Sequence, residues 1–134
     1  GHTVTVYERA EVPGGLLVLG IPDFKMEKVV VERRVKQMEA EGVTFVCNTE
    51  IGKDIPAQKL VDDNDAVLLA IGSTVPRDAA LPGRELKGIE FAMDFLPQQN
   101  RRVAGRAVEG EDILASGKNV VVLGGGDTGS DCLG

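Results

Sequence analysis

A glycine-rich motif directly after an apolar run constrains the fold of this chain more than any other feature. Residues 119–123 have the composition of a buried strand, and residues 124–129 (Gly-Gly-Gly-Asp-Thr-Gly) fit the pattern G-x-G-x-x-G. In a dinucleotide-binding fold Gly124 permits a tight turn, Gly126 lets the backbone approach a pyrophosphate, and Gly129 allows a helix to pack closely on the strand. The motif predicts a nucleotide site that opens a helix, and the alternative is a glycine-rich turn without a ligand.

The other segments alternate between strand and helix patterns, as in an α/β fold. Short β-rich or continuous apolar runs predict strands, whereas apolar residues at helical spacing predict helices that end near glycine or proline. The expected strands are residues 3–7, 43–47, 65–71 and 119–123, with 48–53 returning around a turn as a small antiparallel element, and the expected helices are residues 25–41, 56–62 and 90–99. Residues 13–23 and 101–117 are expected to be loops, and residues 73–88, which are rich in proline and glycine, are expected to be a crossing segment or domain boundary.

Charge and composition exclude several classes of function. The 134 residues, the length of one ordinary domain, include 15 Lys and Arg against 21 Asp and Glu. The net charge of -6 and the lack of a basic tract disfavour nucleic-acid and anionic-membrane partners. The apolar runs are far shorter than the roughly 20 residues that cross a bilayer, and no secretory signal is visible, so we expect a soluble, cytoplasmic protein.

Histidine and cysteine are too sparse for a metal site or a nucleophilic triad. His2 is the only histidine, and Cys47 and Cys132 lie far apart without a CxxC pair. We expect no metal and no catalytic triad, and Cys132 is interpreted as a small residue on a helix face that packs against the sheet.

Glu8 is the second candidate nucleotide contact. It follows the predicted strand 3–7, where a dinucleotide fold places the acid that accepts hydrogen bonds from an adenosine ribose. The glycine loop of such a unit would come about 20 residues earlier, before residue 1. A solvated glutamate at the end of a strand is the alternative.

Several motifs in a fixed order resemble one family over essentially the whole chain. They are Tyr7-Glu8-Arg9, Pro13-Gly14-Gly15-Leu16-Leu17, Gly20-Ile21-Pro22-Asp23-Phe24-Lys25, residues 69–72 with Pro76-Arg77, residues 94–100 (Asp-Phe-Leu-Pro-Gln-Gln-Asn), and the glycine motif ending in Asp131-Cys132. Together they resemble the small (beta) subunit family of NADPH-dependent glutamate synthase, within the glutamate-synthase-like FAD- and NAD(P)-binding oxidoreductases.

The resemblance implies a Rossmann-like two-domain flavoprotein in which an NADPH-binding domain is inserted into an FAD-binding domain. Residues 1–82 would be part of the FAD domain, and residues 83–134 the linker and start of the NADPH domain, with both ends truncated. Iron-sulfur ligands would lie outside this chain, and the partner would be the large (alpha) subunit, which forms glutamate. We expect the isolated chain to be inactive, because half of each cofactor site would be missing.

The resemblance also implies particular cofactor contacts and no catalytic acid or base. For FAD these are Glu8 at the ribose, Arg9 beside the adenosine, the Gly15-Leu16 turn near the flavin and phosphates, Lys25 as a nearby cation, Ile51 at the adenine and Gly72 beside the flavin nucleotide. For NADPH they are Gly124, Gly125, Gly126, Asp127, Thr128 and Gly129.

Alternatives remain for the function and for some residues. The chain could be the electron-input part of another glutamate-synthase-like oxidoreductase, such as dihydropyrimidine dehydrogenase, or a catalytically silent nucleotide-binding or docking module. The residue that separates NAD from NADP would lie about 20 residues beyond the glycine motif. Arg101 and Arg102 are interpreted as solvated charges, with docking of a partner subunit as the alternative.

Overall fold

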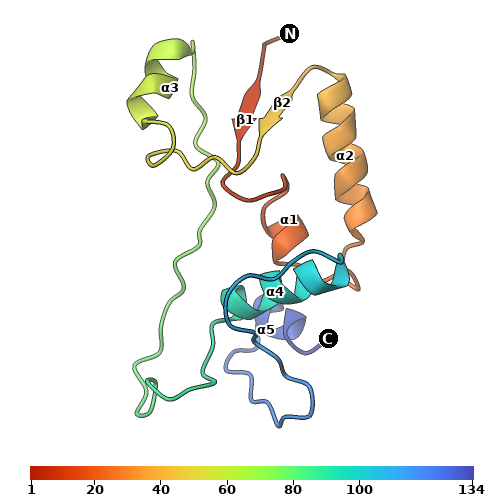
Figure 1. Cartoon of the computed structure of the whole chain (residues 1–134), viewed down its shortest axis with the longest axis vertical. Helices are drawn as coiled ribbons and strands as arrows, with labels where there is room; N and C mark the ends of the chain where they lie inside the picture. Colours follow the sequence, from red (N-terminus) through yellow and green to blue (C-terminus); the bar gives the residue numbers. More distant parts are fainter. The chain divides into compact units, whose positions relative to one another are not determined.

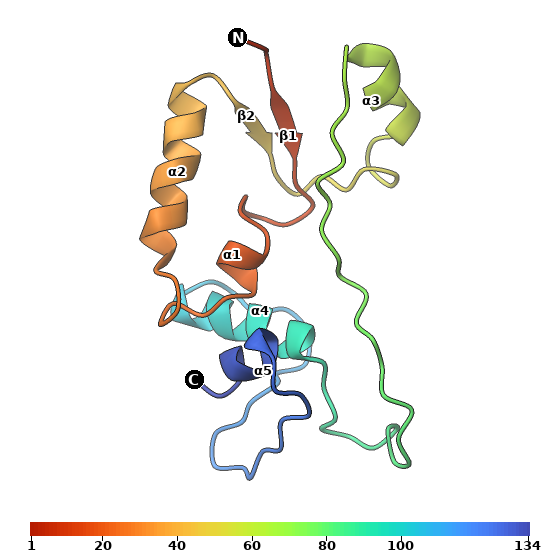
Figure 2. The same cartoon turned by 180° about the vertical axis from the view of Figure 1, so that it is seen from behind.

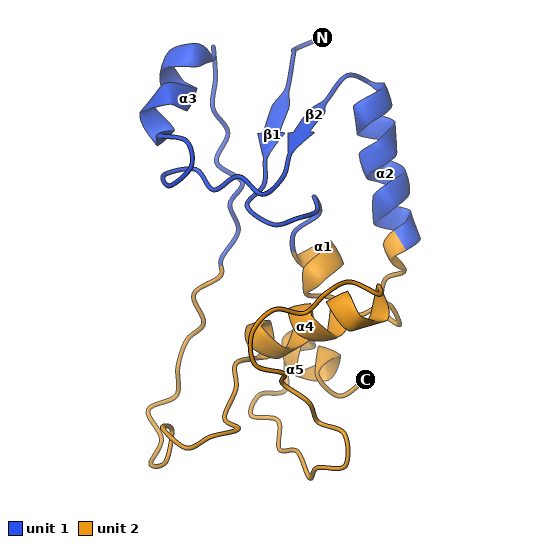
Figure 3. Ribbon diagram, in the orientation of Figure 1, with its two compact units in different colours: residues 1–15, 29–73 blue, residues 16–28, 74–134 orange.

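The computed structural model describes all of residues 1–134, and the chain forms two compact units. Unit 1 comprises residues 1–15 and 29–73, and unit 2 comprises residues 16–28 and 74–134 (Figure 3). Each unit therefore combines two segments that are separated in the sequence. The elements are a mixture of short strands and helices (Figure 1).

Unit 1 contains a two-stranded parallel sheet. Strand β1 (Thr5–Tyr7) pairs with strand β2 (Thr44–Val46), and Val6 lies opposite Phe45 in the register. Parallel strands need a long crossover connection, and here helix α2 (Lys28–Ala40) precedes β2. The chain is thus a mixed α/β protein, as its alternating patterns predict.

Helix α2 confirms the prediction for residues 25–41, although it begins three residues later. It ends where Gly42 adopts a φ of 96°, a conformation that glycine reaches without the strain of a Cβ. The amide of Val43 donates to the carbonyl oxygen of Met38 at 2.9 Å, which satisfies one of the last helical carbonyls. Gly42 therefore acts as the predicted C-terminal stop.

The prediction of an antiparallel element over residues 48–53 is wrong. The amide of Asn48 donates to the carbonyl oxygen of Ala10 and that of Thr49 to the carbonyl oxygen of Glu8, at 2.9 and 3.0 Å. These bonds keep the chain after β2 beside the chain after β1 instead of letting it turn back. Helix α3 (Ala57–Asp63) follows and confirms the helix predicted at 56–62.

The two apolar runs expected as buried strands, residues 65–71 and 119–123, form no strand. They are unpaired and, apart from the half-buried Val122, exposed: Leu68 and Ile71 are 89% and 83% exposed, and Val121 is 83% exposed. A strand requires a hydrogen-bonded neighbour, and the sheet contains only β1 and β2. Their apolar composition predicted strands, but composition does not show whether a neighbouring strand is present to pair with them.

Unit 2 is helical. Its elements are α1 (Leu16–Leu19), α4 (Ala92–Val103) and α5 (Asp127–Asp131), and α4 packs against both of the others (Figure 2). Its apolar core is small, with Val18 of α1 and Leu96 of α4 buried. Helices α4 and α5 confirm the helices predicted at 90–99 and after the glycine motif, whereas α1 lies where the sequence indicated only loop.

Polar side chains of α4 hold the loop that follows it. Gln98 accepts a hydrogen bond from the amide of Ile113 and donates to the carbonyl oxygen of Glu111, both at 3.0 Å. Arg102 forms an ion pair with Asp112 at 2.7 Å. The interpretation of Arg102 as a solvated charge is therefore wrong, because this loop partners it.

Candidate functional site

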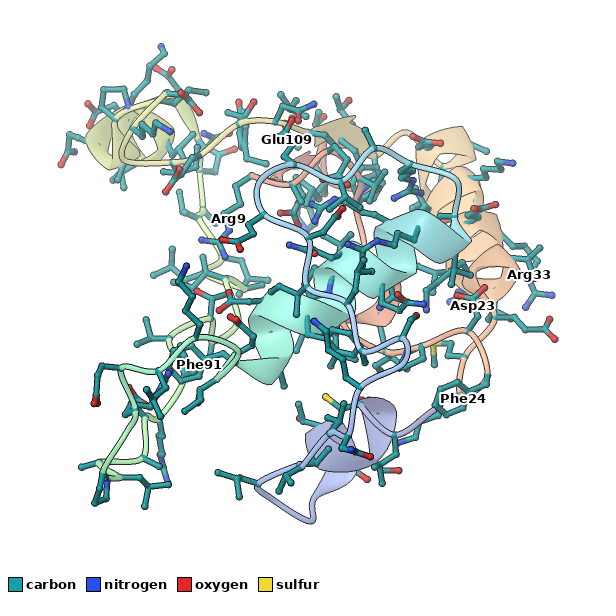
Figure 4. The ribbon with its side chains drawn as sticks, turned by 60° about the horizontal axis from the view of Figure 1, so that its bottom comes forward. Arg9, Asp23, Phe24, Arg33, Phe91 and Glu109 are labelled. Carbon is teal, nitrogen blue, oxygen red and sulfur yellow. The ribbon has the colours of Figure 1, made fainter.

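Glu8 lies immediately after β1, where the sequence placed it. Its amide donates to the carbonyl oxygen of Val46 at 2.9 Å, which extends the β1–β2 ladder by one bond. Its half-buried side chain accepts a hydrogen bond at Oε1 from the amide of Ala10, also at 2.9 Å. One carboxylate oxygen thus fixes the local turn, and Oε2 can accept a further hydrogen bond. The neighbouring Arg9 is exposed (Figure 4).

The thiol of Cys47, which follows β2, lies near several carboxylates, including that of Glu8. Burial raises the pKa of the Cys47 thiol after β2, and the nearby carboxylates of Glu8, Glu11 and Glu39 raise it further.

The backbone before α1 is open. Gly14 and Gly15 have φ values of 118° and 51°, and a Cβ added to Gly15 would meet no atom within 4 Å. Leu16, the first residue of α1, is 52% exposed. Gly14 and Gly15 are therefore left-handed, and they lead into an exposed Leu16 at the start of α1.

Asn100 on α4 holds the end of α1, a role that sequence reasoning missed. Its Nδ2 donates to the carbonyl oxygens of Leu19, Gly20 and Leu96 at 3.1, 3.2 and 3.1 Å. The residue is only 7% exposed. The sequence signal that could have identified Asn100 was its position at the end of the run Asp94–Asn100, whose polar residues had no predicted role.

The glycine motif opens a helix, as its pattern predicts, but the strand expected directly before it is absent. Gly124 has a φ of 127°, and α5 begins at Asp127 with Gly126 as its N-cap. A Cβ added to Gly126 would meet no atom within 4 Å, whereas one added to Gly129 would lie 2.5 Å from the carbonyl oxygen of Gly124. The backbone before α5 is thus open to a ligand, and Gly129 permits a close approach within the turn.

Lys25 lies against α5. Its Nζ forms an ion pair with Oδ1 of Asp131 at 2.5 Å and donates to the carbonyl oxygen of Asp127 at 3.4 Å. The Asp131 side chain is only 9% exposed, against 32% for that of Lys25. The ion pair is not aligned as a hydrogen bond, so the buried Oδ1 has no hydrogen-bond partner. Lys25 was expected beside the first nucleotide, and the structure brings it to the helix that follows the glycine motif.

Burial also affects the cysteine next to this ion pair. The pKa of the Cys132 thiol is raised by desolvation first and by the neighbouring Asp131 carboxylate second. Cys132 is half-buried and forms the C-cap of α5, so it lies one residue beyond the helix face on which the sequence predicted it.

The remaining predicted contacts belong to unit 1. Ile51 forms an isolated parallel bridge with Ile55, and Gly72 has a φ of 66° with open space around it. The structure therefore brings together Lys25 and the glycine motif in unit 2, and it places Glu8, Arg9, Gly15, Ile51 and Gly72 in unit 1. Leu16 falls in unit 2 with α1.

Two further features bear on function. No group of three or more His, Cys, Asp or Glu side chains is arranged to hold a metal ion. None of the helices has the length and apolar character needed to span a membrane.

No protein-family model matches this chain. Individual proteins do match it. It is 54% identical over 138 residues to the protein named glutamate synthase [NADPH] small chain of Mycobacterium tuberculosis, and 48% identical over 134 residues to that of Bacillus subtilis. It is 52% identical over 134 residues to glutamate synthase [NADH] of Saccharomyces cerevisiae.

These matches cover the chain but only part of each relative. They span 100%, 99% and 100% of this chain respectively. They cover 28% and 27% of the two bacterial small chains and 6% of the yeast protein. The chain thus spans about a quarter of the bacterial small chains that it matches.

Proposed function

We propose that this chain, which is homologous over its whole length to part of the glutamate synthases, supplies cofactor contacts in a glutamate synthase electron-input subunit. The intact protein would be a Rossmann-like FAD and NADPH oxidoreductase of glutamate biosynthesis. Residues 1–82 would serve its FAD domain, and residues 83–134 the linker and start of its NADPH domain. Electrons would leave through iron-sulfur centres outside this chain towards a large, glutamate-forming subunit.

The open backbone of the glycine motif is the observation that carries this proposal. A pyrophosphate needs backbone N–H groups that it can approach without meeting side chains. Around Gly125 and Gly126 there is space for such an approach, and the N–H groups in the first turn of α5 have no partner within the helix. The residues present therefore fit a dinucleotide phosphate, even though the chain has a net charge of -6.

The chain's residues would bind and orient the cofactors and perform no proton transfer. Gly124 and Gly129 shape the turn, and the backbone from Gly125 to Thr128 would hold the NADPH pyrophosphate. In unit 1, Oε2 of Glu8 would accept a hydrogen bond from the FAD ribose, because only Oε1 is used by the amide of Ala10. Nicotinamide and flavin supply the hydride chemistry when they are bound.

The names of the relatives differ in the coenzyme, so the coenzyme must be determined by experiment. The bacterial small chains carry NADPH in their names and the yeast protein carries NADH. We propose NADPH, a large-subunit partner and a cytoplasmic location. Equilibrium titration of the protein that carries this chain with NADP⁺ and with NAD⁺ tests the coenzyme directly.

Gly126→Ala tests the proposed function. The φ of -83° at Gly126 accommodates alanine, and the added methyl group meets no protein atom, so folding should change little. The same methyl group would stand where the pyrophosphate approaches. We expect the Kd for NADP⁺ to rise at least about tenfold, which corresponds to about 1.4 kcal/mol, with the melting temperature nearly unchanged.

Ser130→Ala is the matched control, because Ser130 is exposed on the same helix outside the motif. It should leave the Kd for NADP⁺ unchanged. Equal NADP⁺ affinity in Gly126→Ala and the wild type would refute the assignment of the glycine motif to the nucleotide.

A further inference from the structure

Asn100 contacts a part of the chain far from it in sequence. It lies on α4 and donates to the carbonyl oxygens of Leu19 and Gly20, which are separated from it by 81 and 80 positions. Carbonyl groups at the end of a helix have no partner within that helix. The amide of Asn100 thus supplies donors at the end of α1, and its own burial makes those bonds costly to lose.

Helix α1 depends on such contacts for its position. It is four residues long, and an isolated helix of that length is not stable in water. Val18 is buried in unit 2, and the amides of Gly20 and Ile21 both donate to the carbonyl oxygen of Leu16, at 2.9 and 2.8 Å. Asn100 therefore fixes the end of α1. The carbonyl group of Leu16, at the start of α1, is hydrogen-bonded to the amides of that end.

Gly20 makes this end of α1 compact. A Cβ added there would lie 2.9 Å from Cδ2 of Leu16 and 3.1 Å from its carbonyl oxygen. The segment from Leu16 to Gly20 therefore behaves as one tight turn. If the carbonyl groups of Leu19 and Gly20 move, the backbone at Leu16 should therefore move as well.

We propose that Asn100 is a positioning residue for the first nucleotide. It holds α1 in place, and the first residue of α1, Leu16, is a contact that the proposed function assigns to the flavin nucleotide. The inference rests on the proposed function, because that function assigns FAD to this turn. Asn100 itself need not touch the nucleotide.

Asn100→Asp and Asn100→Ala test this role in the full-length protein that carries this chain. The aspartate retains the shape of the side chain but, when ionised, presents only acceptors to three carbonyl oxygens, and alanine removes the side chain's polar atoms. The neighbouring Gln99 is exposed, so Gln99→Ala is the matched control. The Kd for FAD is measured by titration of the apoprotein, and the Kd for NADP⁺ is measured on the same samples.

We expect the Kd for FAD to rise at least tenfold in Asn100→Asp and several-fold in Asn100→Ala. The Kd for NADP⁺ should stay within twofold, and Gln99→Ala should change neither. Hydrogen exchange should accelerate at the amides of Gly20 and Ile21, which report the α1 turn. This split between two affinities separates a positioning role from a general loss of stability.

Three results would overturn the inference. One is an unchanged Kd for FAD in Asn100→Asp, and another is an equal rise in both Kd values with a lower melting temperature, which indicates a purely structural role. A wild-type protein that binds no FAD would overturn the proposed function together with this inference, whereas the first two results leave the proposed function standing.

Discussion

The ion pair between Lys25 and Asp131 predicts an asymmetric response to mutation. The Lys25→Met variant leaves the carboxylate of Asp131, which is only 9% exposed, without its counter-ion. The Asp131→Asn variant instead leaves the ammonium of Lys25, which is 32% exposed and can be solvated. Loss of the lysine should therefore cost more than loss of the aspartate.

The magnitude follows from the burial of the two partners. Removing one partner of a fully buried pair costs about 3–5 kcal/mol, and exposed pairs contribute about 0–1 kcal/mol. Because Lys25 is one third exposed, we expect about 2 kcal/mol for Lys25→Met and about 0.5 kcal/mol for Asp131→Asn. The double variant should resemble Asp131→Asn, since an asparagine needs no counter-ion.

Amide hydrogen exchange within α5 measures this difference locally. The amide of Ser130 donates to the carbonyl oxygen of Gly126 at 3.0 Å and is protected only while the turn is closed. A cost of 2 kcal/mol corresponds to roughly 30-fold faster exchange, and 0.5 kcal/mol to roughly twofold. Equal acceleration in the two single variants, or a larger effect of Asp131→Asn, would refute the reasoning.

Two further predictions concern the same helix. Gly129→Ala places a Cβ 2.5 Å from the carbonyl oxygen of Gly124, so the backbone between these two residues must shift. Titration should then show several-fold weaker binding of NADP⁺. An unchanged affinity would contradict the importance of this contact. Burial and Asp131 raise the pKa of Cys132, so its alkylation by iodoacetamide at pH 8 should be slower than that of a free cysteine. Asp131→Asn should speed alkylation by removing the negative charge, and a slower rate would show that this sign is wrong.

Sequence reasoning succeeded where the structure depends on neighbouring residues. The apolar spacing of α2 and its glycine stop are local signals, as are the positive φ of Gly124 and the start of α5. The position of Glu8 after β1 likewise followed from a short β-rich run. Each of these features is encoded within a few consecutive residues.

Prediction from the sequence failed where an element depends on a partner that is far away along the chain. Residues 65–71 and 119–123 have the composition of strands but no strand to pair with. Asn100 acts across 81 positions and Lys25 across 102, and no local pattern relates such residues. Helix α1 was missed because four residues are too few to show a period.

A structure of the full-length protein that carries this chain, solved with FAD and NADP⁺ bound, tests the central claim most directly. We expect the NADP⁺ pyrophosphate to accept hydrogen bonds from backbone N–H groups between Gly125 and Thr128, and Glu8 to accept one from the FAD ribose. A structure in which NADP⁺ binds elsewhere while the glycine motif contacts no ligand would contradict it.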